Sequence, residues 1–339
     1  MENPIIELNG LTKIYGSVKA VDDLHLTINK GEIFGLLGPN GAGKTTTILM
    51  MLGLAEPSSG SAFVSGLNAT TNPIAVKRKV GYMPDSVGFY DNMTALENLV
   101  YIGRLNGIPE HQIQKRACET MEMVGLGSEM DKKAAAYSRG MKQRLGLADV
   151  LIRDPEVIIL DEPTLGIDPS GVKEFLSFIR HLSRKQGLTV LLSSHHLHQV
   201  QQVCDRVGIF VEGKILVEGN IETLSKNLFG EESFTVVITV KDPLPVSWNN
   251  LKKWEQFEAI QNINVSGKKV EFSCTEDVTP DIVRFFVEKG LNVLGVHKKE
   301  FGLDDIYQRY FENNVKKHIS DGKSGGLFQR SFFKKSKTQ

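Results

Sequence analysis

The stretch Gly38-Pro-Asn-Gly-Ala-Gly43-Lys44-Thr45 decides the fold of this chain. It fits the pattern G-x-x-x-x-G-K-[ST], and it directly follows the apolar run Glu32–Leu37, which predicts a strand. The residues from about Thr45 to Leu52 have a helical pattern, so the glycine-rich segment joins a strand to a helix. The sequence therefore predicts an anion-binding loop between these two elements.

The residue types of this loop suit phosphate groups. Glycines allow the backbone to approach phosphate oxygens, and successive N–H groups form an anion nest at the start of the following helix. We expect Lys44 to reach the β- and γ-phosphates, Thr45 to ligate Mg²⁺ and Thr46 to bond a phosphate oxygen. A chance lysine after a glycine-rich turn would recur on the order of once per hundred such chains. The loop thus predicts a P-loop enzyme whose nucleotide-contacting positions are Gly38, Asn40, Gly41, Gly43, Lys44, Thr45 and Thr46.

Composition limits the classes of function. The 339 residues include 40 basic and 40 acidic side chains, so the net charge is zero and a nucleic-acid partner is not expected. The three cysteines are far apart, which favours a reducing compartment over a disulfide framework. No apolar run approaches the roughly 20 residues that a membrane span needs, and the N-terminus lacks the pattern of a signal peptide.

Hydrophobic patterning divides the chain into regions. β-branched runs alternate with helical patterns over the first 228 residues, which predicts an α/β domain with a largely parallel sheet and a helical subdomain at about 86–150. Residues 229–313 predict a small α+β domain, and residues 314–339 a basic tail without stable structure. The expected strands are Ile5–Leu8, Leu24–Ile28, Glu32–Leu37, Val157–Leu160, Thr189–Ser193, Val207–Val211, Lys214–Glu218, Phe234–Val240, Val270–Cys274 and Leu291–His297, and the expected late helices are Pro280–Lys289 and Leu303–Glu312.

Two carboxylates follow the apolar run Val157–Leu160. Asp161, at the end of the strand, is placed to hold the Mg²⁺ shell opposite Thr45, and Glu162 is placed to act as general base toward water. A strand that leads into an ordinary acidic turn would look the same. The roles of Asp161 and Glu162 can therefore be assigned only together with the motifs near them in the sequence.

Those neighbours resemble a family. The segment Tyr137-Ser138-Arg-Gly140-Met-Lys-Gln-Arg144 resembles the signature motif of ABC transporter ATPases, whose usual form is Leu-Ser-Gly-Gly-Gln. Ser138 and Gly140 match that form, whereas the residues at 137, 139 and 141 depart from it in a way similar to ATPases of second-type ABC exporters. As a serine-capped helix start, the segment offers N–H groups to an anion.

Other positions match the family in order along the chain. The resemblance implies that Asp168 bridges to a second subunit, that His195 is the switch histidine at the γ-phosphate, and that Tyr15 stacks on adenine. Asp85 occupies the position where the family usually has Gln and this subgroup often Glu. Its shorter side chain is compatible with a water-mediated contact to Mg²⁺ or with a capping role in the loop.

The resemblance implies the P-loop NTPase fold of ABC ATPases: a mixed RecA-like sheet, an antiparallel β lead-in and a helical subdomain, followed here by the small α+β domain. It implies an ATPase that binds ATP and Mg²⁺ and dimerises head to tail, as a homodimer or with a sister ATPase. Such a subunit lies at the cytoplasmic face of the membrane and drives transport, with export favoured, through permease subunits on separate chains.

Two alternatives remain open at this stage. A soluble ABC ATPase acting on ribosomes or DNA would usually carry two fused cassettes or long coiled coils, and the sequence has neither. A P-loop kinase or GTPase would lack the signature segment. Beyond Ser320, the tail combines five basic residues with Phe328, Phe332 and Phe333, which fits either a solvated end or contact with an anionic bilayer.

Overall fold

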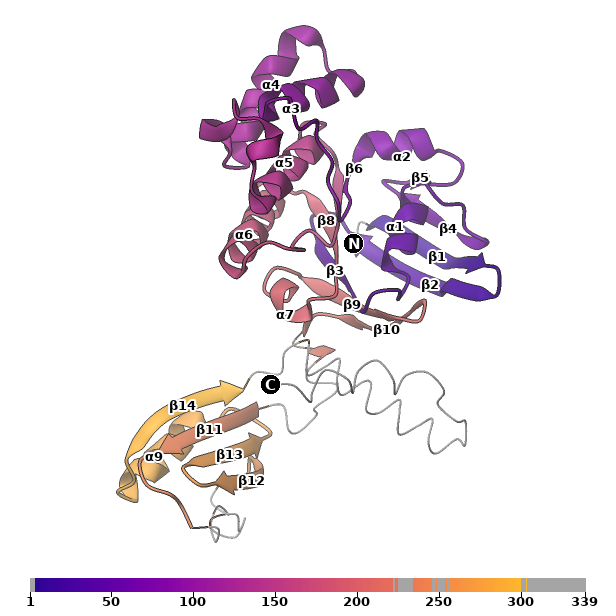
Figure 1. Cartoon of the computed structure of the whole chain (residues 1–339). Coiled ribbons are helices and arrows are strands. Elements are labelled where there is room, and N and C mark those ends of the chain that lie inside the picture. Colours follow the sequence, from indigo (N-terminus) through magenta and orange to yellow (C-terminus); the bar gives the residue numbers. More distant parts are fainter. Residues whose placement is uncertain are drawn as a thin grey trace. The chain divides into compact units, whose positions relative to one another are not determined.

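The computed structural model describes residues 4–221, 223–224, 234–245, 248, 254, 257–299 and 303. Contacts between residues divide the chain into two compact units, Met1–Asn220 and Ile221–Gln339. Each unit is described by itself (Figure 1). Over the described part of the chain, no helix combines the length and apolar character that crossing a bilayer requires.

The first unit contains a six-stranded sheet in the order β10-β9-β3-β8-β7-β6. Five of its strands are parallel, and β10 pairs antiparallel to β9 through a hairpin at Glu212-Gly213. The central strands are buried along their whole length, which explains their continuous apolar sequences. The strands are β3 (Ile33–Leu37), β6 (Val80–Met83), β7 (Val157–Asp161), β8 (Thr189–Ser194), β9 (Arg206–Val211) and β10 (Lys214–Gly219).

A second, antiparallel sheet forms the expected lead-in, with the strand order β2-β1-β4-β5. A shared hydrophobic core joins it to the parallel sheet and to helix α1, whose Ile48, Met50 and Met51 are buried between them. The elements are β1 (Pro4–Tyr15), β2 (Val18–Asn29), β4 (Ser59–Val64), β5 (Leu67–Asn68), α1 (Lys44–Met51) and α2 (Pro73–Lys79).

The helical subdomain lies at the end of the unit opposite to β9 and β10 (Figure 1). Helix α3 begins with a capping box between Thr94 and Glu97, and α4 ends just before Gly125, whose φ of +74° favours glycine. Both helices fall within the predicted helical subdomain. The helices of this region and of the following segment are α3 (Ala95–Leu105), α4 (Glu110–Met123), α5 (Arg139–Leu151), α6 (Pro169–Gln186) and α7 (Leu197–Val200).

The second unit contains an antiparallel sheet, β12-β13-β11-β14, packed on helix α9. Its core is aromatic: the ring of Trp254 lies 4.7 Å from that of Phe272 and 4.9 Å from that of Phe285, between centroids. The elements are β11 (Phe234–Val240), β12 (Ile260–Ser266), β13 (Lys269–Cys274), α9 (Thr279–Glu288) and β14 (Val293–Lys299). The predicted helix Leu303–Glu312, apart from Leu303, and the tail 314–339 lie outside the described residues.

Candidate active site

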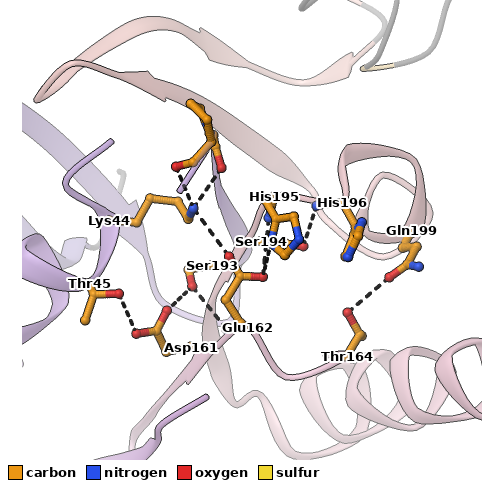
Figure 2. A network of polar contacts seen from close by, with 12 residues as sticks. Lys44, Thr45, Asp161, Glu162, Thr164, Ser193, Ser194, His195, His196 and Gln199 are labelled. Carbon is orange, nitrogen blue, oxygen red and sulfur yellow. Dashed lines mark hydrogen bonds and ion pairs between the residues drawn. The ribbon is translucent and has the colours of Figure 1, made fainter. Parts of the chain in front are cut away.

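The parallel strands bring the expected site residues to one edge of the sheet. Strand β8 lies between β3 and β7, so the residues after Leu37, Leu160 and Leu192 converge where these strands end. Figure 2 shows Lys44, Thr45, Asp161, Glu162, Ser193 and His195 in one polar network at this edge.

The loop glycines are required by the protein's own backbone. A Cβ at Gly38 would lie 2.0 Å from the carbonyl oxygen of Phe210, and a Cβ at Gly43 would lie 2.2 Å from that of Ala20. Gly43 also has a φ of +110°, which L side chains rarely adopt. The loop is therefore held close to β9 and β2, and its following helix begins without a side-chain cap on its first N–H groups.

Lys44 is buried, and three oxygens surround its ammonium group. Nζ donates to the carbonyl oxygens of Gly38 at 2.7 Å and Pro39 at 3.2 Å, and it lies 3.3 Å from Oε1 of Glu162. The side chain thus folds back over its own loop. The positive charge is held at the place where the loop and the Asp161–Glu162 turn meet.

The carboxylate of Asp161 is hydrogen-bonded on both oxygens. Thr45 Oγ1 donates to Oδ2 at 2.8 Å, and the Ser193 hydroxyl donates to Oδ1. The carboxylate belongs to a residue that is only 3% exposed, so its orientation depends on these two hydroxyls.

Glu162 sits on a strained turn and points back into the site. Its φ is +49°, a left-handed value that is uncommon for residues other than glycine. His195 Nδ1 lies 2.8 Å from Glu162 Oε2, and the backbone N–H of His195 also approaches this oxygen, at 3.4 Å. His195 therefore orients the carboxylate that the sequence assigned to the general base. The ring of His196 lies 3.9 Å from that of His195, between centroids, and burial, followed by the His195 charge, lowers the pKa of His196.

A pocket of about 410 Å³ opens over this network. The negative charges of the pocket also act on Tyr82 of β6. Burial first, and then the charges of Asp161 and Asp85, raise the pKa of Tyr82 to about 12. The pocket thus combines a loop suited to anions with carboxylates suited to a cation. Its lining is formed by Ala20, Asn40, Gly41, Ala42, Gly43, Lys44, Thr45, Thr46, Asp85, Asp161, Glu162, Leu165 and His195.

Five expected site residues lie outside this lining: Gly38, which begins the loop, and four residues elsewhere in the chain. Tyr15 is 52% exposed at the end of β1, with the Lys13 ammonium 5.0 Å from its ring centroid. Ser138 caps α5, where its Oγ accepts from the Met141 N–H at 3.3 Å, and Gly140 follows it in the first turn. Asp168 caps α6 by accepting from the Gly171 N–H at 3.1 Å. Their expected contacts with nucleotide or a second subunit stay predictions.

The residues present fit a nucleotide with a hard divalent cation. Thr45 and Asp161 offer oxygen atoms only, and Mg²⁺ prefers such donors while keeping water and phosphate oxygens in its shell. Lys44 and the uncapped first turn of α1 supply positive charge for phosphates. Among the residues described by the structure, no cluster of three or more His, Cys, Asp or Glu side chains is arranged to hold a metal ion.

Sequence reasoning missed four contributors to this site. Ala20, Ala42 and Leu165 line the pocket, and Ser193 hydrogen-bonds the Asp161 carboxylate and the Glu162 N–H. Ala20 reaches the loop from a different sheet, which no local pattern reveals. Ser193 stands directly before Ser194-His195, and only the pairing of β7 with β8 shows which of the two serines faces Asp161.

The loop after β3, the buried lysine and the paired carboxylates after β7, at the same edge of the parallel sheet, define the class of P-loop nucleoside triphosphatases. Residues 21–165 match the family described as ABC transporter. The bacitracin transport ATP-binding protein BcrA of Bacillus licheniformis is 36% identical over 309 residues, which cover 89% of this chain and 96% of that protein. The chain therefore belongs to the ATP-binding proteins of ABC transporters.

Other relatives and solved structures agree with this assignment. The ABC transporter ATP-binding protein NatA of Bacillus subtilis is 41% identical over 216 residues, covering 63% of this chain and 87% of that protein. The structure of cbiO1 from Clostridium perfringens, described as part of the ABC transporter complex cbiONQ, matches with a TM-score of 0.61 and 28% identity. The match covers 65% of this chain and 89% of cbiO1. The expected fold and the expected ATPase class are confirmed.

Proposed function

We propose that this chain hydrolyses ATP with Mg²⁺ between two cassettes and thereby drives export through permease subunits on separate chains. The two cassettes are two copies of this chain, or this chain and a sister ATPase. ATP stabilises the closed pair because its γ-phosphate contacts both cassettes, and hydrolysis removes that differential binding.

The observation that carries the proposal is the separation of two anion-binding features. The pocket holds the phosphate loop and the carboxylates, whereas Ser138 is exposed at the start of α5 and does not contribute to the lining. The first-turn N–H groups of α5 carry partial positive charge, which suits a phosphate. A second copy that presents this helix to the pocket supplies the missing side of the site.

The chain's own residues have distinct tasks in this proposal. Lys44 and the loop bind the β- and γ-phosphates, and Glu162 orients the attacking water and accepts its proton. His195 holds the Glu162 carboxylate in place through Nδ1. Thr45 and Asp161, with Asp85 acting through water, would hold Mg²⁺, which would supply charge that stabilises the phosphates.

Export and membrane location rest on the relatives. The BcrA proteins of Bacillus licheniformis and Enterococcus faecalis are described as bacitracin transport ATP-binding proteins. Both are similar to this chain over the cassette, at 36% and 43% identity. We infer that this chain likewise serves a transporter, that this transporter is an exporter, as the signature segment favours, and that the chain binds its permease at the cytoplasmic face of the membrane.

Replacing the base tests the proposal. Glu162→Gln keeps the shape of the side chain and removes its ability to accept a proton, so we expect ATP binding to persist and turnover to fall by at least about 100-fold. The trapped ATP should then hold a dimer, which sedimentation with Mg²⁺ and ATP measures directly.

The matched control is Glu119→Gln, an exposed carboxylate of α4 whose oxygen lies 3.8 Å from the Lys115 ammonium. This variant should hydrolyse ATP like the parent and should not accumulate a dimer. Parental hydrolysis by Glu162→Gln would show that another group is the base.

A further inference from the structure

One buried hydroxyl joins the two carboxylate-bearing residues of the site. Ser193 is fully buried at the end of β8, and the parallel register places it opposite Asp161 at the end of β7. Its hydroxyl donates a hydrogen bond to Asp161 Oδ1 and accepts one from the backbone N–H of Glu162 at 3.2 Å (Figure 2). The same oxygen therefore contacts the residue expected to hold the metal and the backbone of the residue expected to act as base.

The contact with Asp161 fixes the carboxylate from the side opposite to the loop. Thr45 already donates to Oδ2 from α1, so the Ser193 hydroxyl satisfies the remaining oxygen. A carboxylate held at both oxygens cannot rotate about its χ2 bond without losing a hydrogen bond. Hydrogen bonds of this kind to a metal ligand commonly alter metal affinity or activity by about 10- to 100-fold when removed.

The contact with Glu162 supports a strained backbone. A left-handed φ at a residue other than glycine persists only where its surroundings hold it. At Glu162, with φ of +49°, the N–H bonds both the Oγ and the carbonyl oxygen of Ser193, each at 3.2 Å. Two residues later, His195 holds the side chain of the same glutamate. The end of β8 and the residue that follows this strand thus fix both the backbone and the carboxylate of Glu162.

We propose that Ser193 is a positioning residue that sets the metal-binding oxygens of Asp161 and the turn of Glu162 relative to each other. Its hydroxyl acts through these two residues and does not contact the nucleotide. The inference rests on the proposed function, because it concerns the same hydrolysis. It predicts that metal affinity and turnover fall together when the hydroxyl is removed, while nucleotide binding without metal is retained.

Ser194 provides a matched control in the next position. It is equally buried on the same strand, but its Oγ accepts the His196 N–H at 3.0 Å and makes no described contact with either carboxylate residue. Removing this hydroxyl disturbs packing to a similar degree. A purely structural role for Ser193 would therefore make the two alanine variants behave alike.

The test compares Ser193→Ala, Ser193→Cys and Ser193→Thr with Ser194→Ala. Mn²⁺ is titrated into each protein with a non-hydrolysable ATP analogue, and free Mn²⁺ is followed by electron paramagnetic resonance, which does not depend on turnover. We expect Ser193→Ala and Ser193→Cys to weaken Mn²⁺ binding by about 10-fold or more and to lower kcat by about 10- to 100-fold. Ser193→Thr should restore both, and Ser194→Ala should change neither.

The melting temperature of each Ser193 variant shows whether a loss of metal binding or turnover comes from unfolding or from a displaced site in a folded protein. If Ser193→Ala is too unstable to purify, the nearly isosteric Ser193→Cys variant decides, because it keeps the volume and weakens the hydrogen bonds. Parental Mn²⁺ affinity and kcat in a folded Ser193→Cys variant would overturn the inference. A parent protein without Mg²⁺-dependent hydrolysis would instead overturn the proposed function, so the two failures are distinguishable.

Discussion

Lys44 occupies a position where its charge is already shared among several oxygens. It donates to two loop carbonyls and lies beside Glu162, whose Oε1 is buried and has no hydrogen bond. The Lys44 ammonium therefore has two roles. It is expected to bind phosphate, and it neutralises a buried carboxylate oxygen that would otherwise be costly to keep charged.

Lys44→Ala removes the phosphate-binding charge and leaves that carboxylate without its cationic partner. A hydrogen bond to a charged group contributes about 1.5–3 kcal/mol, so we expect ATP affinity to fall by at least about 10-fold. Equilibrium binding of a fluorescent ATP analogue measures the change. Lys79→Ala, which removes an exposed lysine paired with Glu156, is the control. Equal affinities of the two variants would contradict the assigned role of Lys44.

The central strands of the first unit follow closely from the sequence, for a physical reason, whereas β1 and β2 are longer than predicted and β4, β5 and β6 were not predicted. Its central strands are buried on both faces, so they appear as unbroken apolar runs, and β3 and β7 fall within one residue of their predicted ranges. Strand β12 was missed. Only Ile260 and Ile263 of its seven residues are buried, and a register shift after Ile260 breaks the alternation that identifies a half-buried strand.

Site residues also differ in how far the sequence alone predicts them. The loop positions, Asp161 and Glu162 were predictable because they follow strand ends in a local pattern. The role of Ser193 was not, since it depends on which residue of β8 pairs with Asp161. Pairing between strands is set by three-dimensional packing, so contacts of this kind stay hidden in a single sequence.

In the second unit, an ion pair links the start of α9 to β14. The Lys298 ammonium bonds Asp277, and Thr279 Oγ1 donates to the same carboxylate at 2.7 Å. These contacts, Lys298 first, lower the pKa of Asp277 to about 2. Because the pKa is lower in the folded than in the unfolded state, the contribution to stability is present above about pH 4. It is lost as the pH falls toward about 2.

Asp277→Asn should therefore destabilise this unit near neutral pH and matter less in acid. The side chains are partly exposed, so the effect on the free energy of unfolding is at most about 1 kcal/mol. Both tryptophans of the chain, Trp248 and Trp254, belong to this unit, so tryptophan fluorescence during urea unfolding reports on it. The difference from the parent should shrink between pH 5 and pH 2.5, and Lys298→Ala should show the same trend. A difference that is constant over this range would contradict the assignment.

At the scale of the whole molecule, the chain carries one phosphate loop and one serine-capped signature helix. The pocket around Lys44 is not lined by Ser138 of the same chain. In the proposed function, one complete site therefore requires two chains, and each chain gives its loop to one nucleotide and its signature helix to the other. Two identical subunits related by a two-fold axis satisfy this requirement twice.

This geometry makes a specific prediction about mixed dimers. Lys44→Ala disables the loop side of a site, and Ser138→Arg fills and charges the signature side. Each variant alone should be inactive, because both sites of its homodimer carry a defect. In a dimer of one chain of each variant, one site carries both defects and the other carries none.

The most direct measurement is therefore the ATPase rate of the two purified variants before and after mixing. We predict that the mixture regains Mg²⁺-dependent hydrolysis that neither variant shows alone, and that the regained rate falls on dilution as dimers dissociate. A mixture that stays as inactive as its components, under conditions where sedimentation shows mixed dimers, would contradict a site shared between two chains.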